Sequence, residues 1–443
     1  MTTNSPQTLY TCPGEEHPIS QAVHLSRLAA FYPKCRDCRH RYDTGQLPQQ
    51  TIDRLQSTER RIRRRSLFTT EGVRGIYLNE LTRSKVGHVA AGLASLLWDE
   101  TPLLGRLTAG SADQRKSKRS GPLVIVGYDE RPSSPDIAAG VGSALRRMGC
   151  HVVDIGLTTK PCFCFTVDHF LAAAGAYITG AGYEPAWTGL DVVGRGARPY
   201  SHCAGLDRLE TRLREGFSRP TRYAGSRRAF AATVPYEAGV WKHFHALRPL
   251  QVCCGCPTPM VFRLLTQIFE RLPCELHWIP VPRRVRNVVD DADADACRIA
   301  EAVRRTGSHL GMLIDDDSAR CGFFDERGRM VPGRDVTRAI SEIVLAEHPN
   351  GKVVIESTAI AALQSSIKFF GGQCVDGGTT AAELWTSMHD GEAVFGGGDS
   401  GRFWFREAYP ACDAVLAMAK VLQALSRSDA TFSATVRSDH SSR

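Results

Sequence analysis

The chain has 443 residues and a formal net charge of +8; 42% of its residues are hydrophobic and 23% are charged. This composition is typical of a globular protein and excludes a largely disordered or fibrous one. No run approaches the roughly 18 apolar residues that span a bilayer, and the polar start lacks a signal-peptide pattern. We therefore expect a soluble, cytoplasmic protein with no membrane partner.

Positive charge is concentrated near the N-terminus. Residues 1–66 hold 11 Lys or Arg against 6 Asp or Glu, which is +5 of the total of +8. Much of this charge lies in the arginine run at residues 60–65, which contains no aromatic residue. Since the remaining chain is near neutral, we find no clear signal of nucleic-acid binding and interpret the run as part of a solvated linker or helix end, with a patch for nucleic acid or a partner as the alternative.

The N-terminal segment also contains a candidate metal site. Cys35 and Cys38 have the two-residue gap that lets both thiolates reach one tetrahedral zinc ion. The predicted ligand set of this structural zinc is Cys12, His17, Cys35 and Cys38, with His24 or His40 as alternatives to His17. Without a zinc ion, the same cysteines would be small buried residues with an incidental spacing.

Short apolar runs and helical periods alternate along the body of the chain. A short helical stretch is expected earlier, at residues 19–31. The elements predicted after it fall into three groups: 123–126, 137–148, 151–155, 162–170 and 176–179; then 251–254, 261–271, 275–279, 298–305 and 310–314; then 336–346, 352–355, 359–370, 379–389 and 411–425. This alternation predicts three successive α/β/α sandwich domains, with binding sites at the carboxyl ends of strands.

The expected domain boundaries follow from these groups. They are an N-terminal Cys/His segment and basic linker at 1–66, three α/β/α domains at 67–205, 206–330 and 331–430, and a polar tail at 431–443.

Four loops carry short motifs in a fixed order. They are FTTEGVRG at 68–75, VGYDERPSSP at 126–135, IDDDSAR at 314–320 and VFGGGDSGR at 394–402. These loops resemble FGTSGIRG, VGRDTRPSSP, FDGDADR and GGEQSGH of the α-D-phosphohexomutase family, the phosphoglucomutases and phosphomannomutases. The resemblance extends from residue 68 to about residue 425.

The resemblance implies a hexose phosphate mutase of carbohydrate metabolism, an intramolecular phosphotransferase. Members of the family resemble one another in having four domains around a cleft, a phosphoserine nucleophile, magnesium on three aspartates and a sugar-recognition loop. The fourth domain clamps the substrate phosphate, and we expect it to be missing because the segment after Leu425 is too short to form it.

The nucleophile loop departs from the family pattern. The family sequence ITASHNPPEYNGIKV aligns without a gap to residues 178–192, which places Ala181 at the serine position and Gly182 at the histidine position. A methyl group cannot accept a phosphoryl group, so no intact catalytic residue is expected. Thr179 carries a hydroxyl two residues away, but its use would require the whole loop to shift, and the Tyr183 oxygen lies several ångströms further from the backbone than a serine oxygen.

The acidic loop retains part of the family's metal site. Asp315 and Asp317 match the first two ligand positions, whereas Ala319 stands at the third. Because magnesium accepts few protein carboxylates and several waters, the resemblance predicts a magnesium site that is weak or lost. Three acidic residues on a solvated loop fit the sequence equally well.

The sugar loop keeps Ser400 but has Gly398 in place of the family's glutamate and Arg402 in place of its histidine. In the family, this glutamate accepts hydrogen bonds from sugar hydroxyls. Arginine side chains give bidentate contacts to phosphate. The predicted substrate-binding residues for a phosphorylated sugar are therefore Arg74, Arg131, Arg320, Ser400 and Arg402.

These departures lead to three hypotheses. The first is a family member that is catalytically inactive or impaired and that binds a sugar phosphate or serves as a scaffold. The second is an active mutase with a non-standard nucleophile. The third makes residues 1–66 a zinc module that recruits a partner protein, with the α/β body as its platform.

Overall fold

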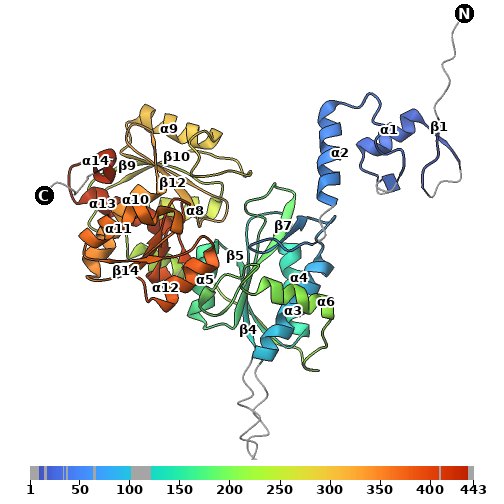
Figure 1. The fold of residues 1–443 in the computed structure, drawn as a ribbon, viewed down its shortest axis with the longest axis horizontal. Helices are drawn as coiled ribbons and strands as arrows, with labels where there is room; N and C mark the ends of the chain where they lie inside the picture. The colour runs from blue at the N-terminus through green and yellow to red at the C-terminus, as the bar shows by residue number, and fades with distance from the viewer. Residues whose placement is uncertain are drawn as a thin grey trace, which may run out of the picture. The chain divides into compact units, whose positions relative to one another are not determined.

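The computed structural model describes residues 9–13, 17–32, 34–35, 38–62, 66–100, 121–408 and 411–437. The chain forms two compact units, Met1–Leu67 and Phe68–Arg443 (Figure 1). The arginine run at 60–65 lies outside the residues whose side chains are described, and residues 438–443 of the predicted tail lie outside the described residues. No helix within the described ranges is long and apolar enough to cross a membrane.

The N-terminal unit is built from two short strands and two helices: β1 Leu9–Tyr10, β2 Ile19–Ser20, α1 Gln21–Ala29 and α2 Gln49–Ile62. The strands pair antiparallel, and this pairing takes up the first residues of the helix predicted at 19–31. Ser20 caps α1, because its hydroxyl accepts a hydrogen bond from the Val23 amide. The Tyr10 ring stacks on His24 at 4.1 Å.

The first sheet of the larger unit has six strands in the order β3-β7-β6-β4-β5-β8. Its strands are β3 Val73–Ile76, β4 Leu123–Tyr128, β5 His151–Leu157, β6 Ala174–Ile178, β7 Trp187–Val193 and β8 Arg227–Ala229. The accompanying helices are α3 Arg83–Glu100, α4 Ser134–Arg147, α5 Lys160–His169 and α6 Leu206–Glu215, followed in the chain by α7 Thr233–Trp241. Every residue of β6 and β7 is buried, as expected for strands covered on both faces.

The first layer extends beyond the boundary predicted at residue 205. Strand β8 pairs in parallel with β5, and α6 packs against α3. Strand β8 could not be predicted from an apolar run, because its residues are Arg227, Arg228 and Ala229; all three are exposed in the structure.

The second sheet has five strands in the order β10-β9-β11-β12-β13. Its elements are β9 Gln251–Gly255, α8 Pro259–Phe269, β10 Glu275–Trp278, α9 Ala294–Thr306, β11 Leu310–Ile314, β12 Cys321–Phe324 and β13 Met330–Val331. Strands β10, β9 and β11 are parallel, and β12 and β13 continue the sheet antiparallel. The acidic loop therefore joins the parallel strand β11 to its antiparallel neighbour β12.

The third sheet repeats this arrangement in the order β15-β14-β16-β17-β18. Its strands are β14 Lys352–Ile355, β15 Gln373–Asp376, β16 Phe395–Gly397, β17 Trp404–Phe405 and β18 Ala411–Cys412. Its helices are α10 Gly333–Glu347, α11 Ile360–Phe369, α12 Ala381–Asp390, α13 Ala414–Ser426 and α14 Phe432–Arg437. The sugar loop joins β16 to β17.

One continuous core joins the three layers, with members from β5, β9 and β14. Helix α13 is buried from Ala414 to Leu425; it is mostly apolar, and its two buried polar residues have partners, Lys420 with Glu347 and Gln423 with the His243 carbonyl. Helix α5 connects the first layer to the third, because it contacts β18 and also packs on β4 and β6 (Figure 1). The predicted polar tail begins within this core, since α14 buries Phe432 and Val436.

Candidate functional site

The nucleophile loop follows β6 and presents a methyl group where the family has a serine. Ala181 is half-buried, and Gly182 beside it adopts φ +77° with open space around its Cβ position. The Thr179 hydroxyl is buried; it donates to Asp129 Oδ2 at 2.9 Å and accepts from the Ala181 amide at 2.9 Å. This hydroxyl is therefore held in the core of the loop and is not available as a nucleophile in this conformation.

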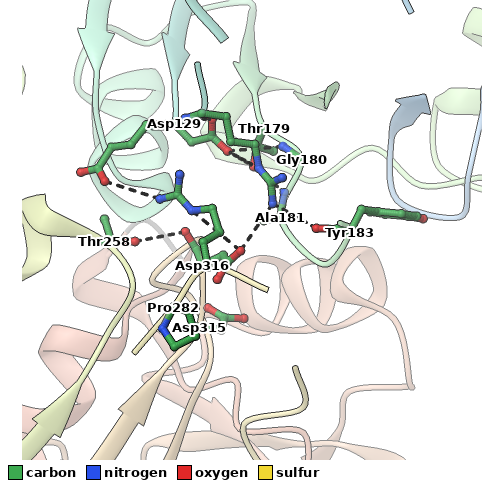
Figure 2. A network of polar contacts seen from close by, with 12 residues as sticks. Asp129, Thr179, Gly180, Ala181, Tyr183, Thr258, Pro282, Asp315 and Asp316 are labelled. Atoms are coloured by element: carbon green, nitrogen blue, oxygen red, sulfur yellow. Dashed lines mark hydrogen bonds and ion pairs between the residues drawn. The ribbon is translucent and has the colours of Figure 1, made fainter. Parts of the chain in front are cut away.

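Arg131 joins the nucleophile loop to the acidic loop. Figure 2 shows these two loops, with Tyr183 of the nucleophile loop and Asp316 of the acidic loop labelled. The Arg131 guanidinium donates to the carbonyls of Tyr183 at 3.2 Å and Glu184 at 3.0 Å, and to Asp316 Oδ2 at 3.4 Å. The side chain is only 1% exposed. Arg131, predicted to bind substrate, is thus buried between the two loops, and its guanidinium is hydrogen-bonded to protein acceptors.

The three consecutive aspartates of the acidic loop point to different partners. Asp316 faces the arginines of the neighbouring segments, with Arg286 Nη2 at 3.7 Å and Arg283 Nε at 4.0 Å. The side chains of Asp315 and Asp317 lie next to each other and are hydrogen-bonded. Burial and the charge of Asp317 raise the pKa of the Asp315 carboxyl well above its usual range. Burial raises the pKa of Asp317, but the Lys160 ammonium together with the hydrogen bonds from Asp315 and the Ala319 amide lowers that pKa below its usual range.

The third ligand position of the metal loop lies in an apolar cluster. Ala319 is buried against Trp385, Trp404 and Cys412. Among the described residues, only the exposed group Glu347, His348 and Glu407 brings three potential metal-ligating atoms within 4.8 Å of one another. The acidic loop therefore does not present the family's three-carboxylate magnesium site.

A buried charge cluster connects β7 to the acidic loop. Asp191 on β7 accepts a hydrogen bond from Arg74 Nη2 at 2.5 Å and another from Lys160 Nζ at 2.9 Å. Lys160 Nζ is also 3.6 Å from Asp317 Oδ2. Burial raises the pKa of Asp191, but the two cations reverse this effect and lower it. Arg74, predicted to bind substrate, thus already has a carboxylate partner.

The sugar loop is held by a carboxylate from β14. Glu356 follows this strand, is buried, and accepts hydrogen bonds from the Ser400 hydroxyl and from the Ser400 amide at 3.0 Å. Arg320 Nε donates to the Ser400 carbonyl at 3.2 Å. Arg402 Nη2 lies 3.5 Å from Glu71 Oε2. The predicted residues Arg320, Ser400 and Arg402 are therefore brought together.

A cavity of about 70 Å³ opens between the first and third layers. Its charged lining consists of Glu71, Lys160, Asp191 and Arg402 of these two layers and Asp317 of the acidic loop in the second layer. Apolar residues of all three layers complete the wall, together with Tyr200 and Ser201. Since one water molecule needs about 10–15 Å³, the cavity has room for a few waters. A hexose phosphate would require the two layers to move apart.

Three residues of this site were not identified from the sequence: Lys160, Asp191 and Glu356. Lys160 and Glu356 lie outside the family motifs, and Asp191 stands where the nucleophile motif has a lysine, a residue of opposite charge. Two of them could have been found from their place in a βα unit: Glu356 directly follows strand β14, and Lys160 begins helix α5 after strand β5. In open α/β sheets, binding residues commonly lie at these carboxyl ends of strands.

The predicted zinc ligands lie in the N-terminal unit and differ in exposure. Cys12, Cys35 and Cys38 are buried, whereas His17 is exposed. Burial and the neighbouring thiols raise the pKa of Cys12 and of Cys35. His24 is also buried; its Nε2 lies 2.9 Å from the Asp43 carbonyl, and its Nδ1 has no hydrogen-bond partner. The three thiols are near enough to influence one another's pKa, but among the described residues of this unit no three ligand atoms lie within 4.8 Å of one another.

Comparison with known proteins agrees with the loop motifs. Residues 100–216 match the family model for phosphoglucomutase/phosphomannomutase, alpha/beta/alpha domain I, and residues 335–441 match domain III of the same family. The phosphohexose mutases of Xanthomonas campestris are 27% identical over 299 residues, which cover 65% of this chain and 65% of that protein. The phosphomannomutase of Salmonella typhimurium is 25% identical over 305 residues, which cover 66% of each.

Solved structures give the same fold. The phosphoglucomutase/phosphomannomutase family protein of Burkholderia thailandensis superposes with a TM-score of 0.71 at 20% identity, covering 84% of this chain and 78% of that one. A phosphomannomutase structure from Thermus thermophilus gives a TM-score of 0.65 at 17% identity, covering 83% and 82%. The body of the chain thus has the α/β phosphohexomutase fold predicted from the sequence. The chain belongs to the phosphoglucomutase/phosphomannomutase family.

Proposed function

We propose that this family member binds a phosphorylated sugar in the cleft between its first and third layers without transferring the phosphoryl group. The main support is the nucleophile loop, where Ala181 offers a methyl group and the nearby Thr179 hydroxyl is engaged with Asp129. Phosphoryl transfer through a covalent intermediate requires a nucleophile at this place. The curated relatives act as mutases according to their names, but this chain covers less than two thirds of their length.

Binding is supported by the cations that line the cavity. Arg402 and Lys160 line the cavity and have side chains that are 28% and 29% exposed. An arginine next to a solvent-accessible cavity can hold a phosphate through two parallel hydrogen bonds. Glu356 binds Ser400 and thereby holds the sugar loop that carries Arg402 at the cavity.

Calorimetric titration with glucose 1-phosphate and mannose 1-phosphate tests binding, and a coupled mutase assay with a bisphosphate activator tests turnover. We expect saturable binding and no turnover above a heat-inactivated control. Arg402→Ala should weaken binding at least tenfold, whereas Arg427→Ala, at an exposed arginine of α13's end, should not change it. Turnover by the wild-type chain would show that another nucleophile acts, and intact mass after incubation with hexose bisphosphate would reveal it.

The N-terminal unit supports a second candidate function, a zinc-stabilised adaptor for a partner protein. The observation that favours it is the burial of three cysteines close together in a unit of only 67 residues, a size at which a metal often supplies stability. Elemental analysis of freshly purified protein tests this proposal, and an absence of zinc would contradict it.

A further inference from the structure

The Lys160 ammonium lies beside the acidic loop, where a bound cation would neutralise the carboxylates. Lys160 is the first residue of α5, and its ammonium lies between two carboxylates on different elements. Nζ is 2.9 Å from Asp191 Oδ2 on β7 and 3.6 Å from Asp317 Oδ2 on the acidic loop. At these distances, Lys160 forms an ion pair with a residue that matches a family metal-ligand position.

The charge on β7 has changed sign relative to the family motif. In ITASHNPPEYNGIKV the residue before the last valine is lysine, whereas this chain has Asp191 at that position. Lys160, from the neighbouring helix, is paired with the aspartate that replaces it. A positive charge is thus still present at this point of the cleft, but it comes from a different element.

The remaining groups of the acidic loop do not complete a magnesium site. Ala319 replaces the third carboxylate and is packed in an apolar cluster, and Asp316 faces Arg131 and Arg286. Magnesium requires near-octahedral oxygen ligands at about 2.0–2.1 Å. A divalent cation at Asp317 would also be repelled by the ammonium already beside that carboxylate.

We propose that Lys160 replaces the divalent cation, so that the chain neutralises its own acidic loop and the cleft works without a metal. One ammonium carries half the charge of magnesium, and Arg74, which shares Asp191 with Lys160, supplies further positive charge. This inference does not depend on which ligand the cleft accepts, because it concerns the protein alone.

Titration with Mn²⁺ as a magnesium probe, followed by electron paramagnetic resonance without any sugar phosphate, tests the proposal. The wild-type chain should show no saturable binding up to millimolar Mn²⁺. Lys160→Met leaves Asp191 and Asp317 facing the vacated space, so it should bind Mn²⁺ at least tenfold more tightly and gain thermal stability from it. Lys160→Arg keeps the charge and should behave like the wild type.

Lys85→Met, at an exposed lysine of α3, is the matched control and should not change Mn²⁺ binding. Saturable submillimolar binding by the wild-type chain would overturn the proposal. So would a folded Lys160→Met variant, verified by circular dichroism, that binds Mn²⁺ no better than the wild type. If Lys160→Met does not fold, the wild-type titration decides alone: saturable binding overturns the proposal, and its absence supports it.

Discussion

The carboxylate of Glu356 lies beside the backbone of Gly398, and a Cβ atom added at Gly398 would clash with it. The family motif GGEQSGH has its glutamate at the position of Gly398. In this chain a glutamate from the end of β14 therefore fills the space next to the sugar loop, and the loop residue has no side chain. The residues at positions 356 and 398 depend on each other, because two glutamate side chains cannot both occupy this space.

Exchanging the two residues tests this dependence. Gly398→Glu alone should destabilise the fold by about 1–3 kcal/mol, because it inserts a second carboxylate into filled space. The double variant Glu356→Gly/Gly398→Glu should recover most of this loss, which urea unfolding followed by tryptophan fluorescence would measure. Strictly additive effects in the double-mutant cycle would contradict the prediction. Glu301→Ala, at an exposed glutamate of α9, provides the control.

Strands and helices could be predicted from the sequence where the apolar runs are long. Site residues could be predicted where they lie within one short motif. Strand β14 coincides with the predicted residues 352–355, because all its inward positions are apolar. The two-residue strands β13, β17 and β18 are too short to produce a pattern. The partners of Arg74 and Arg131 were not predictable, because Asp191 lies 117 residues from Arg74 and Asp316 lies 185 residues from Arg131. Only the folded chain shows that both arginines are already paired.

Removing the Arg131 side chain should unfold the junction between the nucleophile and acidic loops. Arg131→Met leaves Asp129 and Asp316 without their buried partner, which typically costs about 3–5 kcal/mol. Chemical denaturation would measure the loss. Arg83→Met is the matched control, since Arg83 is 57% exposed in its pair with Asp136 and its removal should cost under about 1 kcal/mol. Equal effects of the two variants would contradict the buried role.

Buried thiols should make the protein unstable in alkali. Burial raises the pKa of Cys150, Cys162, Cys164 and Cys256 from 9.0 to about 12. Between these values the unfolded chain loses thiol protons that the folded chain retains, so stability falls as pH rises above about 9. Each such thiol contributes up to about 1.4 kcal/mol per pH unit. Urea midpoints measured under reducing conditions from pH 8 upward would show this decline.

Single variants separate the thiols from other alkaline groups. Cys164→Ala should reduce the slope of stability against pH above pH 9, even if it lowers stability at neutral pH. Cys297→Ser, at an exposed cysteine, should leave the slope unchanged. The prediction fails if the two variants have the same slope.

The ligands of a zinc ion in the N-terminal unit can be distinguished by histidine variants. The His24 Nε2 faces the Asp43 carbonyl, which directs its proton there and leaves the buried Nδ1 lone pair available. Zinc-binding histidines commonly have this arrangement, in which the second ring nitrogen donates to a carbonyl. His24→Ala should therefore lose most of the bound zinc, as should Cys38→Ser, whereas His17→Ala should retain it because His17 is exposed. Zinc content after gel filtration would be measured for each variant, with Cys203→Ser as the exposed control. Loss of zinc in His17→Ala with retention in His24→Ala would restore the ligand set expected from the sequence.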